Sequence, residues 1–425
     1  MTSSNQYLSQ DSLFVKLPSI HEHSDVTLPQ LVLTVRQASI NQYEQLLDQT
    51  YYLIKHDDLE LAEILKLWQI RLILHLFNNQ LAFAKKEAIN LNNALYLHEN
   101  NNVVPPLPPP PPPPQGASSI AAGASSSSLS TSNSATSSNS NSVAPSPSLT
   151  PIYPLPKNNQ SLIDYDLLVL LLRLKSLPNL NLINEVYKLN YQLRLKSSQD
   201  LKTKLINLSY DVMVVMIVTK NYLSLLNYAV NLREELRLLQ SRDEFYDQYL
   251  SNITALLVIV ETIILTHKDK LAGEIPVTEL ITEKYSKIYK EEVNSFTRNS
   301  LIYTIQFIEP TVTVPITESS ISPETTSFDK SDVKLQDIID LVQKNSLTSR
   351  IICSTMGLWD LSNIFPNFKL REGPEHKLEF VNEKKAGVET EEELEEKSAT
   401  ELIDLVYSEV ADNWYKYTYK IYGLE

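Results

Sequence analysis

Apolar side chains recur at every third or fourth position through much of this chain, and no other feature constrains the fold as strongly. The pattern runs through 31–97 and again through 161–266, and short polar stretches such as TKN and QSRD interrupt it. Apolar residues with this period line one face of an α-helix, and loops of a few residues join antiparallel helices. The sequence therefore predicts an all-α protein built from helical hairpins.

Glycine is scarce, which favours the same fold class. Only 7 of the 425 residues are Gly. Glycine supplies tight turns and the loops that cradle phosphate groups, so its scarcity argues against Rossmann and P-loop enzymes. The sequence also lacks GxxxxGK[ST], HExxH and CxxC motifs. We therefore predict a protein that is not an enzyme, with no catalytic, cofactor-binding or metal-binding residues and no cofactor.

The net charge and the cysteine content limit which partners and which compartment fit this chain. The formal net charge is −14, so the chain as a whole repels a phosphate backbone, and we expect no nucleic-acid partner. Cys353 is the single cysteine, which excludes an intrachain disulfide and fits a reducing compartment. Its apolar neighbours predict a buried, inert thiol.

The sequence predicts neither a secretory signal nor a membrane-spanning helix. The first residues, MTSSNQYLSQDSLF, lack the basic and apolar regions of a secretory signal. The longest apolar run, 253–265, is shorter than the roughly 20 residues of a membrane-spanning helix, and Glu261 interrupts it. We therefore expect a soluble, intracellular protein without a membrane span.

A low-complexity stretch separates the two periodic regions. Residues 105–114 are proline except for Leu107, and 116–150 are mainly Ser, Ala and Asn. Such a composition cannot bury enough apolar surface to offset the entropy lost on ordering, so it predicts a disordered insertion. The proline run is a candidate polyproline II ligand for profilin, SH3 or WW domains. The alternative, an expanded insertion in a loop, is the favoured interpretation.

The hairpin LWQIRLILHLFNNQLAFAKKEAINL, at 67–91, matches a tetratricopeptide unit. Such a unit is a 34-residue helix pair with a bulky residue early in its first helix and small residues where the helices cross. Trp68 is the early aromatic residue, and Ala84 and Ala88 are the small ones. Leu72 stands where the repeat usually has glycine.

The same template fits 206–239, with Met213 on the first helix and Tyr222, Leu225 and Ala229 on the second. Two matching units favour a tetratricopeptide-like solenoid of α-hairpins. A plain helical bundle is the alternative, because periodicity alone does not separate the two.

The last hundred residues are less regular. The stretch 389–396 is acidic and is expected to be a solvated linker. Tyr415, Tyr419 and Tyr422 fall on one face of a final helix. Large rings there either dock on a partner or cap the last apolar face of the solenoid, and capping is the favoured interpretation.

The expected organisation has six parts. They are a flexible leader at 1–30, a helical-repeat segment at 31–100, the disordered insertion at 101–152, the main helical-repeat segment at 153–309, a loop at 310–330, and a C-terminal helical region with an acidic linker at 331–425.

The order of these motifs resembles a known family. LKLWQIRLILHLFNNQLAFAKKEAINLNN is followed by IYPLPKNNQSLIDYDLLVLLLRLK, then by NLSYDVMVVMIVTKNYLSLLNYAVNL and YDQYLSNITALLVIV. This succession is similar to the tetratricopeptide-containing subunit twelve of the trafficking protein particle (TRAPP) complex. The resemblance covers about 31–266. The chain departs from the family by its Pro/Ser-rich insertion and by its C-terminal part.

The resemblance implies a non-catalytic scaffold subunit of a TRAPP-like vesicle-tethering complex that activates a Rab GTPase in ER-to-Golgi transport and autophagy. The partners it implies are other TRAPP-like subunits, in particular a large subunit-eleven-like neighbour, and indirectly the Rab GTPase. The implied location is the cytoplasm, peripherally on Golgi or early secretory membranes. The alternative is a tetratricopeptide-like adaptor in a proteasome-lid-like or chaperone-linked assembly.

Overall fold

The structure is a computed structural model. It describes residues 6–18, 26–38, 43–56, 58–101, 155–156, 163–195, 201–239, 243–272, 276–309, 334–343, 347–364, 368–372, 378–382 and 390–424. The predicted insertion, except for its first residue, and the predicted 310–330 loop lie outside the described residues.

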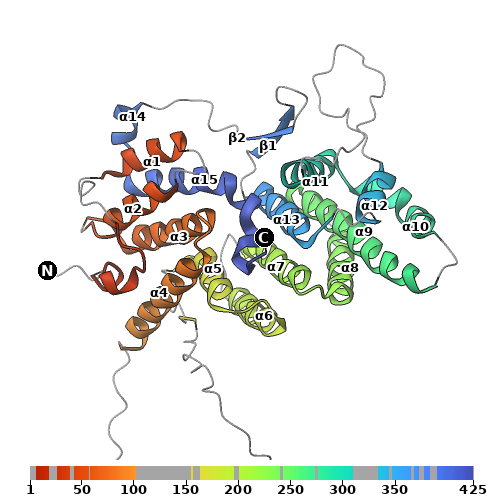
Figure 1. Cartoon of the computed structure of the whole chain (residues 1–425), viewed down its shortest axis with the longest axis horizontal. Helices are drawn as coiled ribbons and strands as arrows, with labels where there is room; N and C mark the ends of the chain where they lie inside the picture. Colours follow the sequence, from red (N-terminus) through yellow and green to blue (C-terminus); the bar gives the residue numbers. More distant parts are fainter. Residues whose placement is uncertain are drawn as a thin grey trace, which may run out of the picture.

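The all-α prediction is confirmed, because helices dominate the described residues (Figure 1). The α-helices are α1 (Leu28–Gln37), α2 (Tyr43–Ile54), α3 (Leu61–Phe77), α4 (Leu81–Asn101), α5 (Tyr165–Lys175), α6 (Leu180–Leu195), α7 (Leu201–Val218), α8 (Tyr222–Leu238), α9 (Glu244–Ala272), α10 (Val277–Glu292), α11 (Ser295–Ile308), α12 (Leu335–Gln343), α13 (Ser349–Ile364), α14 (Glu391–Glu395) and α15 (Ala399–Tyr417). Three 3₁₀ turns are η1 (Gln6–Leu8), η2 (Asp11–Leu13) and η7 (Thr418–Tyr422).

The first ten helices form a linear array. Each helix from α1 to α9 packs on the next one along the chain, and the array extends across the long axis of the molecule (Figure 1). Short connections make neighbouring helices antiparallel. This is the arrangement of stacked helical hairpins, while the tetratricopeptide solenoid itself stays a prediction.

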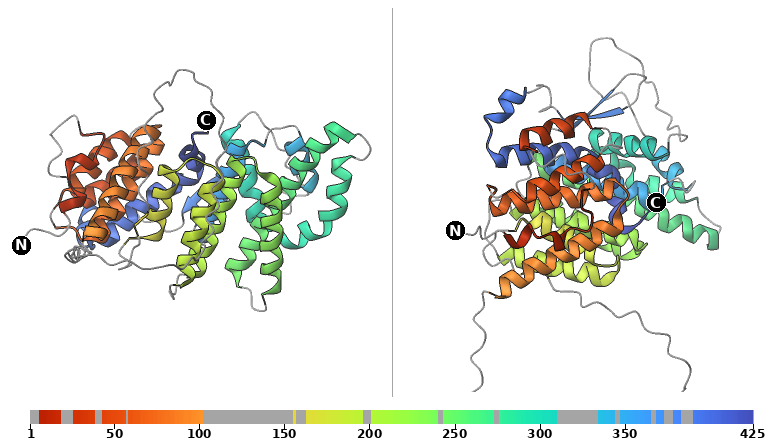
Figure 2. Two further views of the ribbon diagram at one scale, coloured as in Figure 1. Left: turned by 90° about the horizontal axis from the view of Figure 1, so that it is seen from below. Right: turned by 60° about the vertical axis from the view of Figure 1, so that its left-hand side comes forward.

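The helices that follow α11 run back along this array. Helix α12 packs on α9 and α10, α13 on α7 and α11, and α15 on α1 and α3. The blue helices accordingly lie between red and green ones that are far away in sequence (Figure 2). The C-terminal helices therefore pack mainly on odd-numbered helices of the array. Two of these, α3 and α7, are the first helices of the hairpins α3/α4 and α7/α8.

The predicted flexible leader at 1–30 is wrong for residues 6–18. Leu8 is fully buried, and its carbonyl accepts a hydrogen bond of 3.1 Å from Trp68 Nε1. The Phe14 ring stacks on Trp68 with 4.6 Å between centroids. Isolated apolar side chains, too few to show a helical period, hold this segment against α3 and α4.

The C-terminal region, predicted to be helical with an acidic linker at 389–396, also contains two strands, and its acidic run contains a short helix. Strands β1 (Phe368–Glu372) and β2 (Leu378–Asn382) form an antiparallel hairpin in which Leu370 pairs with Phe380. Helix α14 occupies the acidic run, where Thr390 and Glu393 form a capping box and Leu394 is buried. These elements are only five residues long, which is too short for periodicity to reveal.

The hairpins α3/α4 and α7/α8 share one turn. Asn79 and Lys220 have φ of 57° and 55°, the left-handed conformation that glycine usually takes at a helix C-terminus. The next amide in each turn, that of Gln80 or Asn221, donates back to a carbonyl five residues earlier, at 2.8 and 2.9 Å. In this glycine-poor chain, Asn and Lys take the position that the turn requires.

Among the described helices, α9 contains the one stretch that is both long and apolar enough to cross a membrane. Within Glu244–His267, a window of 18 residues has a mean hydropathy of 1.8, and 72% of that window is buried within the fold. The core helix of a soluble protein has the same properties. The expected absence of a membrane span therefore stays a prediction.

Candidate functional site

The predicted repeat-packing residues of the first hairpin are all in the core. Trp68, Leu72, Ala84 and Ala88 have no exposed surface. The two alanines are located on α4 where it faces α3 and α5, and a larger side chain has no room there. These residues therefore act through packing and form no accessible site.

The second hairpin repeats this arrangement with one difference. Met213, Leu225 and Ala229 have no exposed surface, whereas Tyr222 is half-buried. The Tyr222 hydroxyl lies 3.5 Å from Ser349 Oγ at the start of α13. Tyr222 thus links the hairpin to a helix that returns from the C-terminal region.

The candidate docking tyrosines do not form an exposed surface. Tyr419 and Tyr422 are 3% and 8% exposed, and the side chain of Tyr415 lies outside the described residues. The Tyr422 hydroxyl accepts a 2.7 Å hydrogen bond from Arg173 Nε on α5, and the Arg350 guanidinium lies 4.7 Å from the centre of the Tyr419 ring. For these two residues the docking hypothesis is wrong, because the rings anchor η7 inside the fold.

A buried ionic centre joins α3 to α4. Arg71 contacts the Glu87 carboxylate through Nε and Nη2 at 2.8 and 2.9 Å, and His75 Nε2 is 3.1 Å from Glu87 Oε2. The three side chains are at most 1% exposed. Burial raises the pKa of Glu87, but hydrogen bonds from His75 and Arg71 outweigh it and lower that pKa to about 2.

The ionic centre also fixes the surrounding segments. Arg71 donates to the carbonyls of Leu47 on α2 and Lys16 in the N-terminal segment, at 2.7 and 2.8 Å. The amide of Val15 donates to Glu87 at 2.9 Å. We interpret this group as structural, because its side chains are sealed from solvent and the Arg71–Glu87 pair is held by each other and by backbone groups.

The single cysteine of the chain lies in the core. Cys353 is fully buried, and burial raises the pKa of its thiol to about 12, so it is protonated at neutral pH. Within the described parts of the chain, no group of three or more His, Cys, Asp or Glu side chains is arranged to hold a metal ion.

Exposed apolar side chains concentrate on three helices, α4, α6 and α8, which we call the outer helices. Of the fourteen large apolar side chains that are exposed among the described residues, nine lie there. They are Phe83, Ile89, Leu97, Leu180, Tyr187, Tyr191, Leu223, Val230 and Leu238. The largest exposed fractions among them are 80% for Leu238 and 66% for Tyr191. Large exposed apolar surfaces mark protein-binding sites more often than single exposed side chains do.

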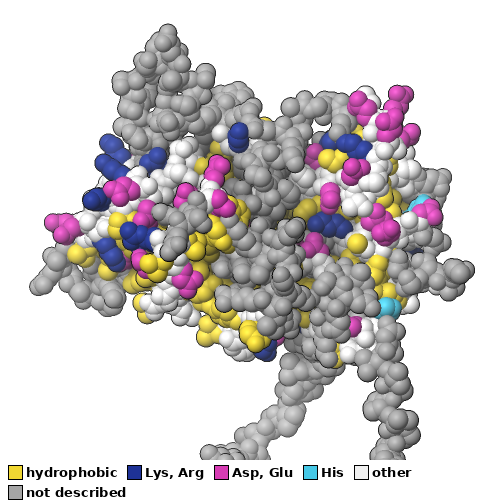
Figure 3. Space-filling view, turned by 180° about the vertical axis from the view of Figure 1, so that it is seen from behind, with side chains coloured by type: hydrophobic (Ala, Val, Ile, Leu, Met, Phe, Trp, Pro, Cys, Tyr) yellow, Lys and Arg dark blue, Asp and Glu magenta, His cyan; other side chains and the backbone are white. Residues whose placement is uncertain are grey.

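The outer helices face away from the returning C-terminal helices. In Figure 1 they lie below α15 and α13, which pack on the odd-numbered helices. The view from behind shows apolar side chains reaching the surface in the lower half of the molecule (Figure 3). The array therefore has one side covered by its own chain and another side that is open.

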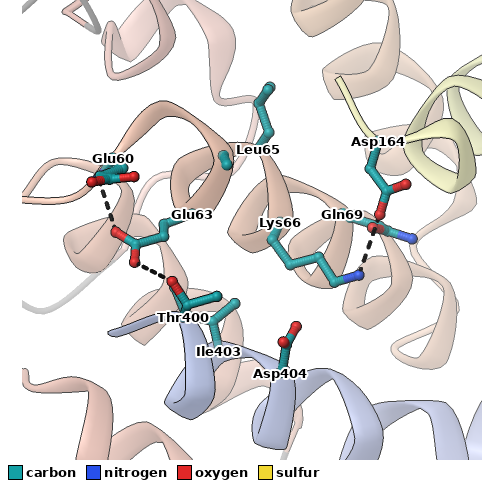
Figure 4. A pocket seen from close by; sticks show the side chains of 10 residues that line it. Glu60, Glu63, Leu65, Lys66, Gln69, Asp164, Thr400, Ile403 and Asp404 are labelled. Carbon is teal, nitrogen blue, oxygen red and sulfur yellow. Dashed lines mark hydrogen bonds and ion pairs between the residues drawn. The ribbon is translucent and has the colours of Figure 1, made fainter. Parts of the chain in front are cut away.

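An acidic pocket of about 200 Å³ lies between α3, α15 and the start of α5 (Figure 4). Four carboxylates line it, against one cation, Lys66. They are Glu60, Glu63, Asp164 and Asp404.

Two of the pocket carboxylates have partners within the fold. Glu63 accepts from Thr400 Oγ1 at 2.9 Å and from the Glu60 amide at 2.8 Å. Lys66 Nζ is 3.6 Å from Asp164 and lies 3.8 Å from the centre of the Tyr407 ring. Lys66 is thus held at one side of the pocket.

Gln69 forms a buried part of the pocket wall. It is 3% exposed, and its Nε2 donates to the Tyr407 hydroxyl at 3.2 Å. Its Oε1 has no hydrogen-bond partner among the described residues. A buried carbonyl without a donor is costly, and this oxygen is covered by its neighbours rather than open to the pocket.

Comparisons with known proteins identify no relative. No family model matches the chain, and neither a curated protein nor a solved structure shows significant similarity to it. Function is therefore inferred from these surfaces.

Sequence reasoning missed the ionic centre and the acidic pocket. A signal for the first exists, because Arg71 and His75 stand four residues apart inside a stretch that is otherwise almost entirely apolar. The pocket has no local signal, since Glu63 and Thr400 are 337 positions apart.

Proposed function

We propose that this protein is a non-catalytic scaffold subunit that binds another subunit of a multiprotein assembly through its outer helices. The observation that carries this proposal is the concentration of exposed apolar side chains on α4, α6 and α8. The odd-numbered helices are covered by α13 and α15, so they are unavailable to a large ligand. Burying such side chains against a partner is favourable by roughly 25 cal/mol per Å².

The assembly that we propose is a TRAPP-like vesicle-tethering complex in ER-to-Golgi transport and autophagy. The succession of motifs over 31–266 supports this assignment. The expected contact is a large subunit-eleven-like neighbour, and the Rab GTPase is reached only through other subunits. The corresponding location is cytoplasmic, at the periphery of Golgi or early secretory membranes.

The test is affinity purification of the tagged protein from its own cells, followed by mass spectrometry. We expect TRAPP-like subunits to be recovered with the wild-type protein. Recovery of proteasome-lid or chaperone components in their place would refute the TRAPP-like assignment.

Substitutions on the outer helices test the surface itself. The triple variant Leu180→Ser, Tyr191→Ser and Leu223→Ser changes side chains that are 56–66% exposed, so folding is retained while partner recovery falls at least tenfold. The matched control is Leu280→Ser with Phe307→Ser, which changes exposed apolar side chains on α10 and α11. Equal partner recovery from both variants would show that the outer helices are not the binding surface.

A further inference from the structure

A second pocket, which we call the basic pocket, lies where η7 meets the α3/α4 turn and the start of α13. Asn79 and Leu81 line it from the hairpin, Arg350 from α13, and Tyr419 and Lys420 from η7. Its volume of about 460 Å³ is within the roughly 300–1,000 Å³ of small-ligand sites. Asn79 is exposed, so the pocket opens to solvent and a ligand can extend beyond it.

The basic pocket has an unbalanced positive charge. Arg350 and Lys420 line it, and none of its described lining residues is Asp or Glu. Burial and, after it, the nearby charge of Arg350 lower the pKa of Lys420. Arg350 is also in the first turn of α13, where the helix dipole places partial positive charge and where no residue is acidic. Bringing like charges together costs free energy, and an anion between them offsets that cost.

The guanidinium of Arg350 has one edge available to a ligand. Its centre lies 4.7 Å from the centre of the Tyr419 ring, which fixes its position. Its Nε is covered by neighbouring atoms and is out of reach. Nη1 and Nη2 are neither covered in this way nor hydrogen-bonded within the described part of the chain. These two nitrogens form the edge of a guanidinium that donates two parallel hydrogen bonds to a carboxylate or a phosphate.

Two cations at one site match a phosphate better than a carboxylate. Lys420 Nζ donates to Asn79 Oδ1, and an ammonium has three N–H donors in all. A carboxylate has one negative charge, whereas a phosphate monoester carries about −1.5 to −2 at pH 7 and has three strong acceptor oxygens. Leu81 and Leu424 add apolar surface beside the cations, where the organic part of an ester can pack.

We propose that the basic pocket binds a phosphate monoester, held by Nη1 and Nη2 of Arg350 and by the Lys420 ammonium. The group that carries the phosphate packs on Leu81 and Leu424. A phosphorylated side chain of a partner protein and a small phosphorylated metabolite present the same chemistry. The site lies on α13 and η7, apart from the outer helices, and it does not depend on the assembly to which the protein belongs.

Phosphorus-31 NMR on the full chain tests the proposal, because a slowly tumbling protein broadens the phosphorus line of a small ligand that binds to it. The probes are methyl phosphate, a monoester, and dimethyl phosphate, a diester with a single negative charge. At equal concentrations we expect the broadening of methyl phosphate to exceed that of dimethyl phosphate at least fivefold. Equal broadening, or none, would overturn a site for the monoester.

Protein variants locate the binding. Arg350→Lys keeps a cation beside Tyr419 but loses the paired donors, and we expect it to lower the broadening of methyl phosphate at least threefold. Lys420→Gln removes one charge and should have a similar effect. The control Lys287→Gln removes one charge from an exposed position on α10 and leaves the broadening unchanged. With folding of all three verified by circular dichroism, an unchanged signal in Arg350→Lys or an equal loss in Lys287→Gln would overturn the site.

Two larger probes decide the source of the phosphate. The peptide acetyl-Gly-Gly-phosphoserine-Gly-Gly-amide represents a partner protein, and glycerol 3-phosphate represents a metabolite. At least threefold more broadening of one of them than of the other identifies the source and supports the site. Broadening of neither, when methyl phosphate is broadened, would overturn a site for an esterified phosphate of biological size.

The chain also has a carboxylate of its own near this pocket in sequence. Glu425 follows Leu424, which lines the pocket. If the ligand is external, Glu425→Gln changes the broadening of methyl phosphate by less than twofold. A gain of tenfold would show that the pocket serves the carboxylate of Glu425, which would overturn an external ligand.

Discussion

The α3/α4 and α7/α8 hairpins have the same turn around different interiors. When the hairpins are aligned on Asn79 and Lys220, the two buried alanines, Ala88 and Ala229, coincide. The ionic centre has no counterpart in the second hairpin, where the aligned residues are apolar or aromatic. They are Val212, Met216 and Tyr228 in place of Arg71, His75 and Glu87.

The difference follows from what covers each hairpin. The Arg71–Glu87 pair binds backbone groups of α2 and of the N-terminal segment, so the charges fix both segments against the hairpin. The second hairpin is packed by long helices on either side, α6 and α9, and needs no such centre. The same hairpin backbone can therefore have an ionic or an apolar interior, depending on the segments that pack against it.

The largest expected effect is a difference in stability loss between substitutions in the two hairpin interiors. Glu87→Gln leaves the buried Arg71 guanidinium without its counterion, and this loss of one partner of a buried ion pair costs about 3–5 kcal/mol of unfolding free energy. Tyr228→Phe at the aligned position removes one hydroxyl and costs about 1 kcal/mol. Urea unfolding followed by circular dichroism measures both, and similar losses would contradict the comparison.

The contribution of Glu87 depends on pH in a defined direction. The folded-state pKa of about 2 is below the ordinary value of 4.5, so the stabilisation is complete above about pH 4.5 and is lost as pH falls toward 2. The difference in stability between wild type and Glu87→Gln should therefore shrink between pH 5 and pH 3. A difference that stays constant over that range would show that Glu87 acts through shape alone.

A smaller loss of stability, equal in the two hairpins, is expected at the aligned buried alanines. Ala88→Leu and Ala229→Leu each force a larger side chain into a closed helix crossing and lower the free energy of unfolding by about 1–3 kcal/mol. Ala82→Leu, at an exposed position of α4, is the control and changes stability by less than about 0.5 kcal/mol. A harmless leucine at either buried position would break the alignment of the hairpins.

The smallest effect concerns the shared turn. Lys220→Gly relieves a left-handed conformation that is unfavourable for residues with a Cβ atom, and we expect a gain of about 0.5–1 kcal/mol. Asn79→Gly gains less, because asparagine tolerates this conformation and its side chain accepts a hydrogen bond from Lys420. Lys220→Ala keeps the Cβ atom and should bring no gain in thermal or urea unfolding.

Periodicity predicted the elements that repeat and missed the ones that do not. The first and second hairpins were predicted with their buried alanines, because a helix of 16 residues or more shows its apolar face several times over. The hairpin β1/β2 and the turn at Gln6–Leu8 are three to five residues long, so no period is visible in them. From the sequence we expected Tyr419 and Tyr422 either to cap the last apolar face of the solenoid or to dock on a partner. The hydrogen bond between Tyr422 and Arg173 on α5 is visible only in the structure.

The candidate site depends on contacts that no local pattern contains. The acidic pocket exists because Asp404 on α15 is brought beside Gln69 on α3, and the open side of the array is defined by where α13 and α15 return. Exposed apolar residues on α6 looked like core residues in the sequence, because helical period alone does not say which face meets a neighbour.

The packing of α15 on α1 also affects how the chain folds during its synthesis. Arg36 on α1 pairs with Glu409 on α15 at 3.3 Å, across 373 positions of sequence. At roughly 5–20 residues per second, a ribosome makes the second residue about 20–75 s after the first. Throughout that interval the apolar faces of α1 and α3 lack their final cover, so we expect the nascent chain to expose apolar surface for longer than a protein with purely local helix contacts.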